Sequence, residues 1–179
     1  MTTHFKLAPW LTAVTLAVGF TASTPAFAYN QSDLDQLLKT NACNGCDLSN
    51  ADLSNKELYG AALKSANLRG ANLTNALLKE AKLDGANFSN TAMTGAIVNA
   101  ATASGTDFTG ANLKNSKFIN TQIDGANFTK ADMSQADFSS VIASCSIPSD
   151  KTTCTKFVSA IGVSTVLNSS TLIGADLSN

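Results

Sequence analysis

Several residue types on which enzyme chemistry depends are scarce in this sequence. Its 179 residues include one histidine, His4, and one tryptophan, Trp10, and both precede Tyr29. From Tyr29 onward there is no histidine, which excludes serine–histidine and cysteine–histidine nucleophilic schemes in that part of the chain. No glycine is followed by the lysine of a phosphate-binding loop. Outward acids that recur with a repeat, described below, give no reason to assign a general acid or base.

The segment before Tyr29 has the composition of a secretory signal peptide. His4 and Lys6 form a weakly basic start, residues 7–20 are apolar, and residues 24–28 end in an A-x-A cleavage signal. The apolar run is shorter than the roughly 20 residues that a membrane-spanning helix needs. We therefore expect cleavage after Ala28, export, and no membrane contact of the mature chain. The alternative is an uncleaved amphipathic tail.

The remaining chain has little charge and no basic cluster. The sequence has 12 Lys and Arg residues, of which Lys6 leaves with the predicted signal peptide. The remaining chain has 11 basic and 13 acidic residues, so its net charge is 11 − 13 = −2. Arg69 is the single arginine. Nucleic-acid-binding proteins carry a clustered basic patch, so we expect no nucleic-acid partner.

From Leu48 onward, a large apolar residue occurs at every fifth position. The run has nineteen central positions without an insertion, and only Ala103 is small. The central residues are Leu48, Leu53, Leu58, Leu63, Leu68, Leu73, Leu78, Leu83, Phe88, Met93, Val98, Ala103, Phe108, Leu113, Phe118, Ile123, Phe128, Met133 and Phe138. A small residue, usually alanine, stands two positions before most of them, and Lys56 is the one real exception.

A period of five fits neither an amphipathic helix nor a plain strand. Because the small and the central residue are two apart, an extended backbone directs both to one side. The residue between them points outward and is often Asp or Asn, and turn residues such as Gly70 and Gly85 complete the unit. Each unit is thus an extended edge followed by a corner, and such edges must wind around a common axis.

This A-[D/N]-L-x-x pattern resembles that of the pentapeptide-repeat family. The resemblance implies an all-β solenoid, a right-handed quadrilateral β-helix with four pentapeptides per coil, over residues 46–138. Ala103 then lies between Leu83 and Ile123 of the neighbouring coils, which predicts either an under-packed layer or a pocket. The resemblance carries over no catalytic residue and no cofactor.

Residues outside the run are expected to close its ends. In residues 29–45 we predict a short capping helix that begins at Ser32 and turns Leu34, Leu37 and Leu38 toward the core. We interpret residues 139–164 as a non-repeat excursion. The terminal repeats, residues 165–179, then resume around Leu167, Leu172 and Leu177. The open last coil predicts either an end-to-end homodimer or coverage by the excursion.

Four cysteines in an exported chain indicate disulfides. A Cys145–Cys154 bond would close the excursion, and Cys43 and Cys46 are either bonded to each other or small core residues. Cys43 and Cys46 also have the C-x-x-C spacing of thiol redox sites, although such sites normally begin a helix. A zinc site needs four ligands and would require all four cysteines, so we predict no metal.

These observations favour a non-catalytic interaction or scaffold module with an unknown protein partner. Residues 91–106 carry no charge and form a candidate docking face. The alternatives are a thiol–disulfide redox protein using Cys43 and Cys46, and a DNA mimic that acts on gyrase, as in some family members. The DNA-mimic alternative conflicts with the low net charge and with the export signal. Residues 37–48 resemble the start of exported cyanobacterial pentapeptide-repeat proteins, which implies the periplasm or the thylakoid lumen.

Overall fold

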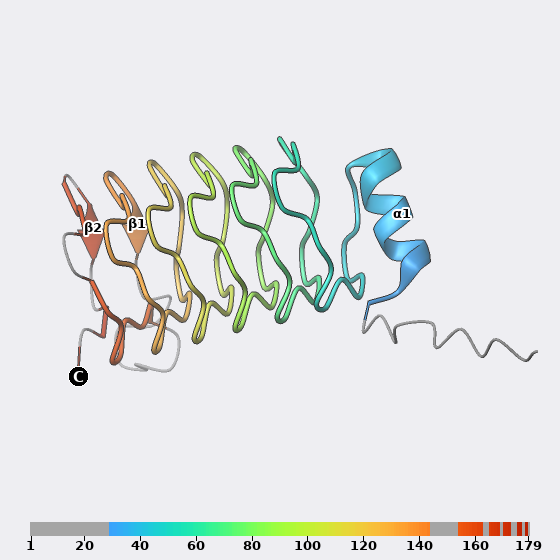
Figure 1. Ribbon diagram of the computed structural model, residues 1–179. Helices are drawn as coiled ribbons and strands as arrows, with labels where there is room; N and C mark the ends of the chain where they lie inside the picture. Colours follow the sequence, from blue (N-terminus) through green and yellow to red (C-terminus); the bar gives the residue numbers. More distant parts are fainter. Residues whose placement is uncertain are drawn as a thin grey trace, which may run out of the picture.

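The computed structural model describes residues 29–143, 154–162, 165–168, 170–172, 175–176 and 178. The predicted signal peptide, residues 1–28 with cleavage after Ala28, therefore lies outside the described residues. The chain forms one stack of coils, with helix α1 (Gln31–Thr40) over its first end (Figure 1). The short strands β1 (Ile142–Ala143) and β2 (Thr171–Leu172) lie side by side near the other end.

Parallel backbone pairing between positions i and i+20 defines the coil. Ala42 pairs with Ala62, Ala62 with Lys82, and the same step continues to Gln122 and Ile142. A coil is therefore four pentapeptides, and each pentapeptide supplies one side. Each bridge residue is the outward residue of its unit, so the outward residues form a column on every side.

We name the four sides by these columns, in chain order. Side A contains Asp47, Asn67, Asn87, Asp107 and Asn127; side B contains Asp52, Asn72, Ala92, Asn112 and Asp132; side C contains Glu57, Leu77, Ile97, Lys117 and Asp137; side D contains Ala42, Ala62, Lys82, Thr102, Gln122 and Ile142.

The corners share one backbone conformation. The second residue after each central residue has a positive φ, for example 59° at Asn50 and 69° at Gly70. The amide of the next residue donates to the central carbonyl, as from Ala51 to Leu48 at 3.0 Å. Positive φ at the third residue alone is the pattern of a type II turn, which favours Gly or Asn there. This requirement explains the turn residues that end the repeat units.

All nineteen central residues are buried, including Ala103. Ala103 lies between the Leu83 and Ile123 units, since the neighbouring Thr102 pairs with Lys82 and Gln122. Phenylalanines fill the later coils: Phe108 and Phe128 are stacked with ring centroids 4.9 Å apart, and Phe118 meets Phe108 edge-on at 5.6 Å. Such pairs contribute beyond their buried area.

The solenoid is longer than residues 46–138, which corrects the predicted boundaries. Pairing starts at Ala42, and it continues at Ile142 into β1 and resumes at Lys156. The residue numbers of partners differ by 20 up to Gln122–Ile142, by 29 from Asn127–Lys156 to Ile142–Thr171, and by 20 again for Lys156–Asp176. The coil that contains β1 is therefore nine positions longer than the others, since 29 − 20 = 9.

Much of the expected excursion at 139–164 therefore belongs to the coils. The sequence concealed this because the central positions there hold Ala143 and Gly162, which lack a large side chain. The hydrogen bonds between the backbones of successive coils need no side chain, so they continue where the large apolar residue at every fifth position is absent. Phe157 returns to the central position and is 8% exposed.

Helix α1 covers the first coil, with two differences from the prediction. Its N-cap is Asn30, whose Oδ1 accepts from the Ser32 amide at 3.0 Å, so Ser32 is not the cap. Leu34 and Leu37 are buried against the core, whereas Leu38 is 49% exposed. The buried face of the helix is thus narrower than the three leucines indicated.

Candidate functional site

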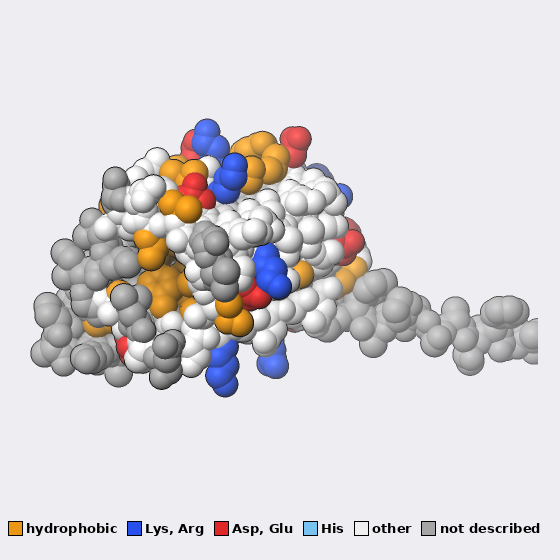
Figure 2. Space-filling view, turned by 60° about the vertical axis from the view of Figure 1, so that its left-hand side comes forward, with side chains coloured by type: hydrophobic (Ala, Val, Ile, Leu, Met, Phe, Trp, Pro, Cys, Tyr) orange, Lys and Arg blue, Asp and Glu red, His pale blue; other side chains and the backbone are white. Residues whose placement is uncertain are grey.

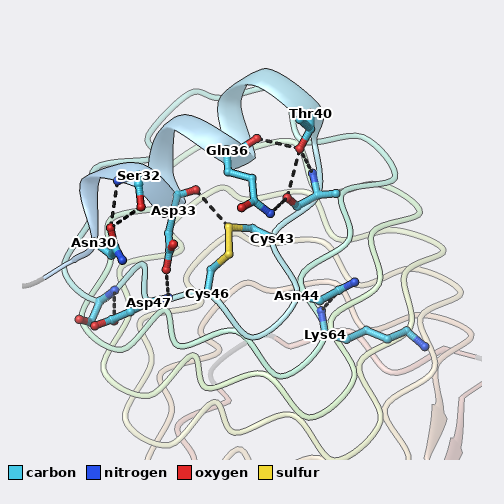
Figure 3. Close-up of a disulfide and its surroundings, with 12 residues drawn as sticks. Asn30, Ser32, Asp33, Gln36, Thr40, Cys43, Asn44, Cys46, Asp47 and Lys64 are labelled. Atoms are coloured by element: carbon cyan, nitrogen blue, oxygen red, sulfur yellow. Dashed lines mark hydrogen bonds between the residues drawn. A yellow bond between two sulfur atoms is a disulfide. The ribbon is translucent and has the colours of Figure 1, made fainter.

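The two cysteines of the C-x-x-C motif form a disulfide under α1 (Figure 3). Cys43 Sγ lies 3.1 Å from the carbonyl oxygen of Asp33 in α1. The Asp33 carboxylate accepts from the Asp47 amide at 2.8 Å. Asp33 therefore connects the helix both to the disulfide and to the first edge of side A.

This environment does not favour thiol–disulfide exchange. Cys43 is fully buried and Cys46 is 8% exposed, whereas reactive cysteines are accessible enough to meet a reagent. The motif begins a coil edge and not a helix, since α1 precedes it. Cys154 is buried and disulfide-bonded, and its predicted partner Cys145 lies outside the described residues.

On sides A and B, the outward Asp and Asn side chains bind their own backbone. Their Oδ1 atoms accept from the amide two residues later, for example from Ser89 to Asn87 at 2.9 Å and from Ser134 to Asp132 at 3.1 Å. Successive coils are also joined, as Asn67 Nδ2 donates to Asp47 Oδ1 at 3.0 Å. We call A and B the Asx sides. Their carboxylates hold the backbone in place and give no catalytic arrangement.

On sides C and D, which we call the mixed sides, three of the equivalent amides are bound in another way. The acceptor comes from the corner of the preceding coil: Asn44 for Lys64, Asp84 for Ser104 and Asn99 for Ile119, at 2.9–3.2 Å. Sequence reasoning missed these three residues, because their partners lie one full coil away. Asp137 on side C keeps the role, since its Oδ1 accepts from the Ser139 amide at 2.9 Å, whereas the apolar outward residues Leu77 and Ile97 of the same side have no acceptor to offer.

Hydrogen bonds also determine the ionisation of the acids. The Ser134 and Ser49 hydroxyls and amides hold the pKa values of Asp132 and Asp47 below the usual range. Partial burial raises the pKa of Asp84, but bonds from Lys64, Thr102 and Ser104 outweigh it and the pKa is lowered. Ion pairs of 3.1 Å join Lys64 to Asp84 and Lys114 to Asp132. These acids stay ionised near neutral pH, as their structural role requires.

No cluster of three or more metal-ligating side chains occurs in the described part of the chain. The described residues also include no helix with the length and apolar character needed to cross a membrane. Charged side chains are scattered singly over the face seen in Figure 2, without a basic or acidic patch.

The uncharged stretch 91–106 is not one face, which corrects the expected docking surface. Because each side of a coil is a single pentapeptide, this stretch passes along sides B, C and D in turn. It therefore forms a belt around most of one coil. Apolar outward residues gather instead on side C, where Leu77 pairs with Ile97 and Tyr59 at the nearby corner is 51% exposed.

The fold is similar to that of one solved structure with a TM-score above 0.5. QnrB1, a plasmid-mediated fluoroquinolone resistance protein, is 18% identical with a TM-score of 0.55 over 75% of this chain. The alignment spans 61% of the QnrB1 chain. HetL, from the cyanobacterium Nostoc sp. strain PCC 7120 and involved in heterocyst differentiation regulation, is 21% identical with a TM-score of 0.39, covering 72% of this chain and 71% of HetL.

A thylakoid-lumen pentapeptide-repeat protein from Arabidopsis thaliana is 31% identical with a TM-score of 0.28, covering 59% of this chain and 71% of its own. No curated protein matches the chain significantly. The family model for pentapeptide repeats matches segments from residue 43 to residue 142, namely 43–79, 61–99, 71–110 and 106–142. Together with the coil of four pentapeptides, this match shows that the chain belongs to the pentapeptide-repeat family.

Proposed function

We propose that this chain is an exported, non-catalytic scaffold whose mixed sides bind a protein partner. Its frame is a right-handed quadrilateral β-helix that α1 closes at one end. Its location is the periplasm or the thylakoid lumen. The cleavage signal at Ala28 and the Cys43–Cys46 disulfide support export, because disulfides persist in oxidising compartments.

The observation that carries the proposal is the division of the outward positions. On the Asx sides these side chains bind the backbone, so their identity is constrained by folding. On the mixed sides a corner residue performs this task for Lys64 and for Ile119, and the apolar outward residues of side C, Leu77 and Ile97, take no part in it and are available for recognition. Loops and surfaces released from structural demands are where binding residues concentrate.

Side C has the composition of a small protein interface. Leu77 and Ile97 form an apolar centre, with Glu57 and Lys117 next in the column on either side. An apolar centre within a polar rim is the usual anatomy of a recognition surface, and an exposed tyrosine such as Tyr59 is a frequent anchor.

Cross-linking in the native compartment tests the proposal. The tagged protein is cross-linked in place and captured, alongside an Ile97→Lys variant and an Ala92→Lys control. Both substitutions add one lysine at an outward position of the same coil, on side C and side B respectively. We expect one recurrent partner that Ile97→Lys removes and Ala92→Lys retains.

Loss of the partner in both variants, or in neither, would contradict recognition through side C. A cooperative melting transition must be retained in both variants, since the outward positions do not fill the core. If no partner is recovered with the unsubstituted protein, the scaffold proposal itself fails.

A further inference from the structure

The corner between sides A and B contains a notch that is lined by polar groups and by the single arginine of the sequence. The notch holds about 500 Å³ and is lined by Ser49, Asn50, Asn67, Arg69, Gly70 and Asn90. It spans three coils, because Asn50, Gly70 and Asn90 are equivalent corner residues of successive coils.

Gly70 lets the Asn50 side chain lie close to the backbone at the notch. Its φ of 69° suits glycine, and a Cβ at this position would collide with Asn50 Oδ1. The Asn50 side chain therefore takes the space that a side chain at position 70 would need, and the Asn90 side chain lies over Gly110 in the same way. Both asparagines line the notch together with Gly70.

Three side chains that line the notch donate to no group in the described part of the chain. Arg69 is the single arginine of the sequence, and its guanidinium forms no ion pair or hydrogen bond with the described residues. The side-chain amides of Asn50 and Asn90 likewise have no hydrogen-bond partner among those residues, whereas Asn67 Nδ2 is bound to Asp47. No carboxylate is among the described residues that line the notch.

We propose that this notch binds an oxyanion group, a carboxylate or a phosphate. A guanidinium presents a planar fork that matches two oxygens of either group, which a lysine ammonium cannot reproduce. The Asn50 and Asn90 amides, above and below in the same column, supply further N–H donors to the remaining oxygen atoms. This ligand site lies on the Asx sides and is independent of partner binding on side C.

The single arginine makes the test direct. In ¹⁵N NMR spectra the protein shows one arginine Nε–H signal, which reports on Arg69 without assignment of other residues. Sodium phosphate and sodium acetate are titrated separately at constant ionic strength, with sodium chloride as the reference. We expect saturable shifts of the Arg69 Nε–H signal with phosphate, acetate or both, and only small linear shifts with chloride. Saturation with one of the two identifies which oxyanion the notch prefers.

Two variants and a matched control give the geometric test, followed through the Gly70 backbone amide. Arg69→Lys retains the charge and loses the fork, and should weaken binding about tenfold or more. Asn50→Gly should weaken it several-fold, whereas Asn120→Gly should leave it unchanged. Both asparagines have the positive φ of a corner, 59° and 57°, so glycine is accepted equally well. Linear shifts that chloride reproduces, or undiminished binding in both notch variants, would overturn the proposal.

Discussion

The two Asx sides and the two mixed sides share one core but differ in what their outward residues do. On the Asx sides an Asp or Asn such as Asn87 binds the amide of its own corner. On the mixed sides an acceptor from the preceding coil, such as Asn99, binds the equivalent amide. The familiar Asp or Asn of the repeat is therefore a solution to backbone hydrogen bonding. Departures from it mark positions that folding does not constrain.

In the core, the Asx sides and the mixed sides should respond alike to substitution, and the largest loss of stability is expected there. Leu73→Asp on side B and Leu78→Asp on side C each bury an unpaired carboxylate at a fully buried position. We expect both to lower the free energy of unfolding by about 4 kcal/mol or more, measured by urea denaturation. Ala92→Asp, at an outward position of side B, is the control and should leave stability nearly unchanged. A much milder effect on one side would show that the two halves have different cores.

The core was the part that the sequence predicted best. A large side chain at every fifth position identifies the inward positions, and all nineteen are buried, Ala103 included. The ends were predicted less well, because the backbone ladder continues through Ala143 and Gly162 without a large central residue. A pattern of side chains cannot reveal an edge that only the backbone maintains.

The candidate sites were predicted in part. The C-x-x-C spacing indicated the Cys43–Cys46 pair as one of two alternatives, but not its position beneath α1. The 91–106 stretch looked like a face until the coil length was known. The Arg69 notch had no signal in the sequence, because Asn50 and Asn90 are two coils apart along the chain and line one notch only because the coils stack.

The outward positions should show the difference between the sides most clearly. Asn87→Ala removes the acceptor for both the amide and the hydroxyl of Ser89. We expect a loss of about 1 kcal/mol in unfolding free energy, or about 2–4 °C in Tm. Lys117→Ala on side C should change stability by less than about 0.5 kcal/mol. Equal losses in thermal denaturation would mean that the mixed sides are as constrained as the Asx sides.

Acid should weaken the hydrogen bonds that the outward aspartates of the Asx sides accept from their own backbone. The pKa of folded Asp132 is lowered by its bonds to Ser134 and by Lys114, so its contribution to stability is present above the pKa of the unfolded chain, 3.8. That contribution is lost as the pH falls through the lower, folded value. Asp132→Asn retains an acceptor for Ser134 without this titration. Urea midpoints measured from about pH 6 to about pH 2.5 should therefore fall less steeply for the variant than for the original protein. Parallel curves would show that Asp132 is not stabilised in its ionised form.

Substitutions at the corners should change stability equally on the Asx sides and the mixed sides, and the smallest change is expected there. Ala100 on side C and Gln135 on side B have φ values of 57° and 60°, a conformation that costs a residue with a Cβ about 1–2 kcal/mol. Glycine removes this cost but loses more conformational entropy on folding, about 0.5–1 kcal/mol. Ala100→Gly and Gln135→Gly should therefore each raise the free energy of unfolding by about 0.5 kcal/mol, detectable in urea midpoints at constant m-value. Destabilisation by either glycine would mean that its corner is held by side-chain contacts, and a gain on one side only would extend the division between Asx and mixed sides to the turns.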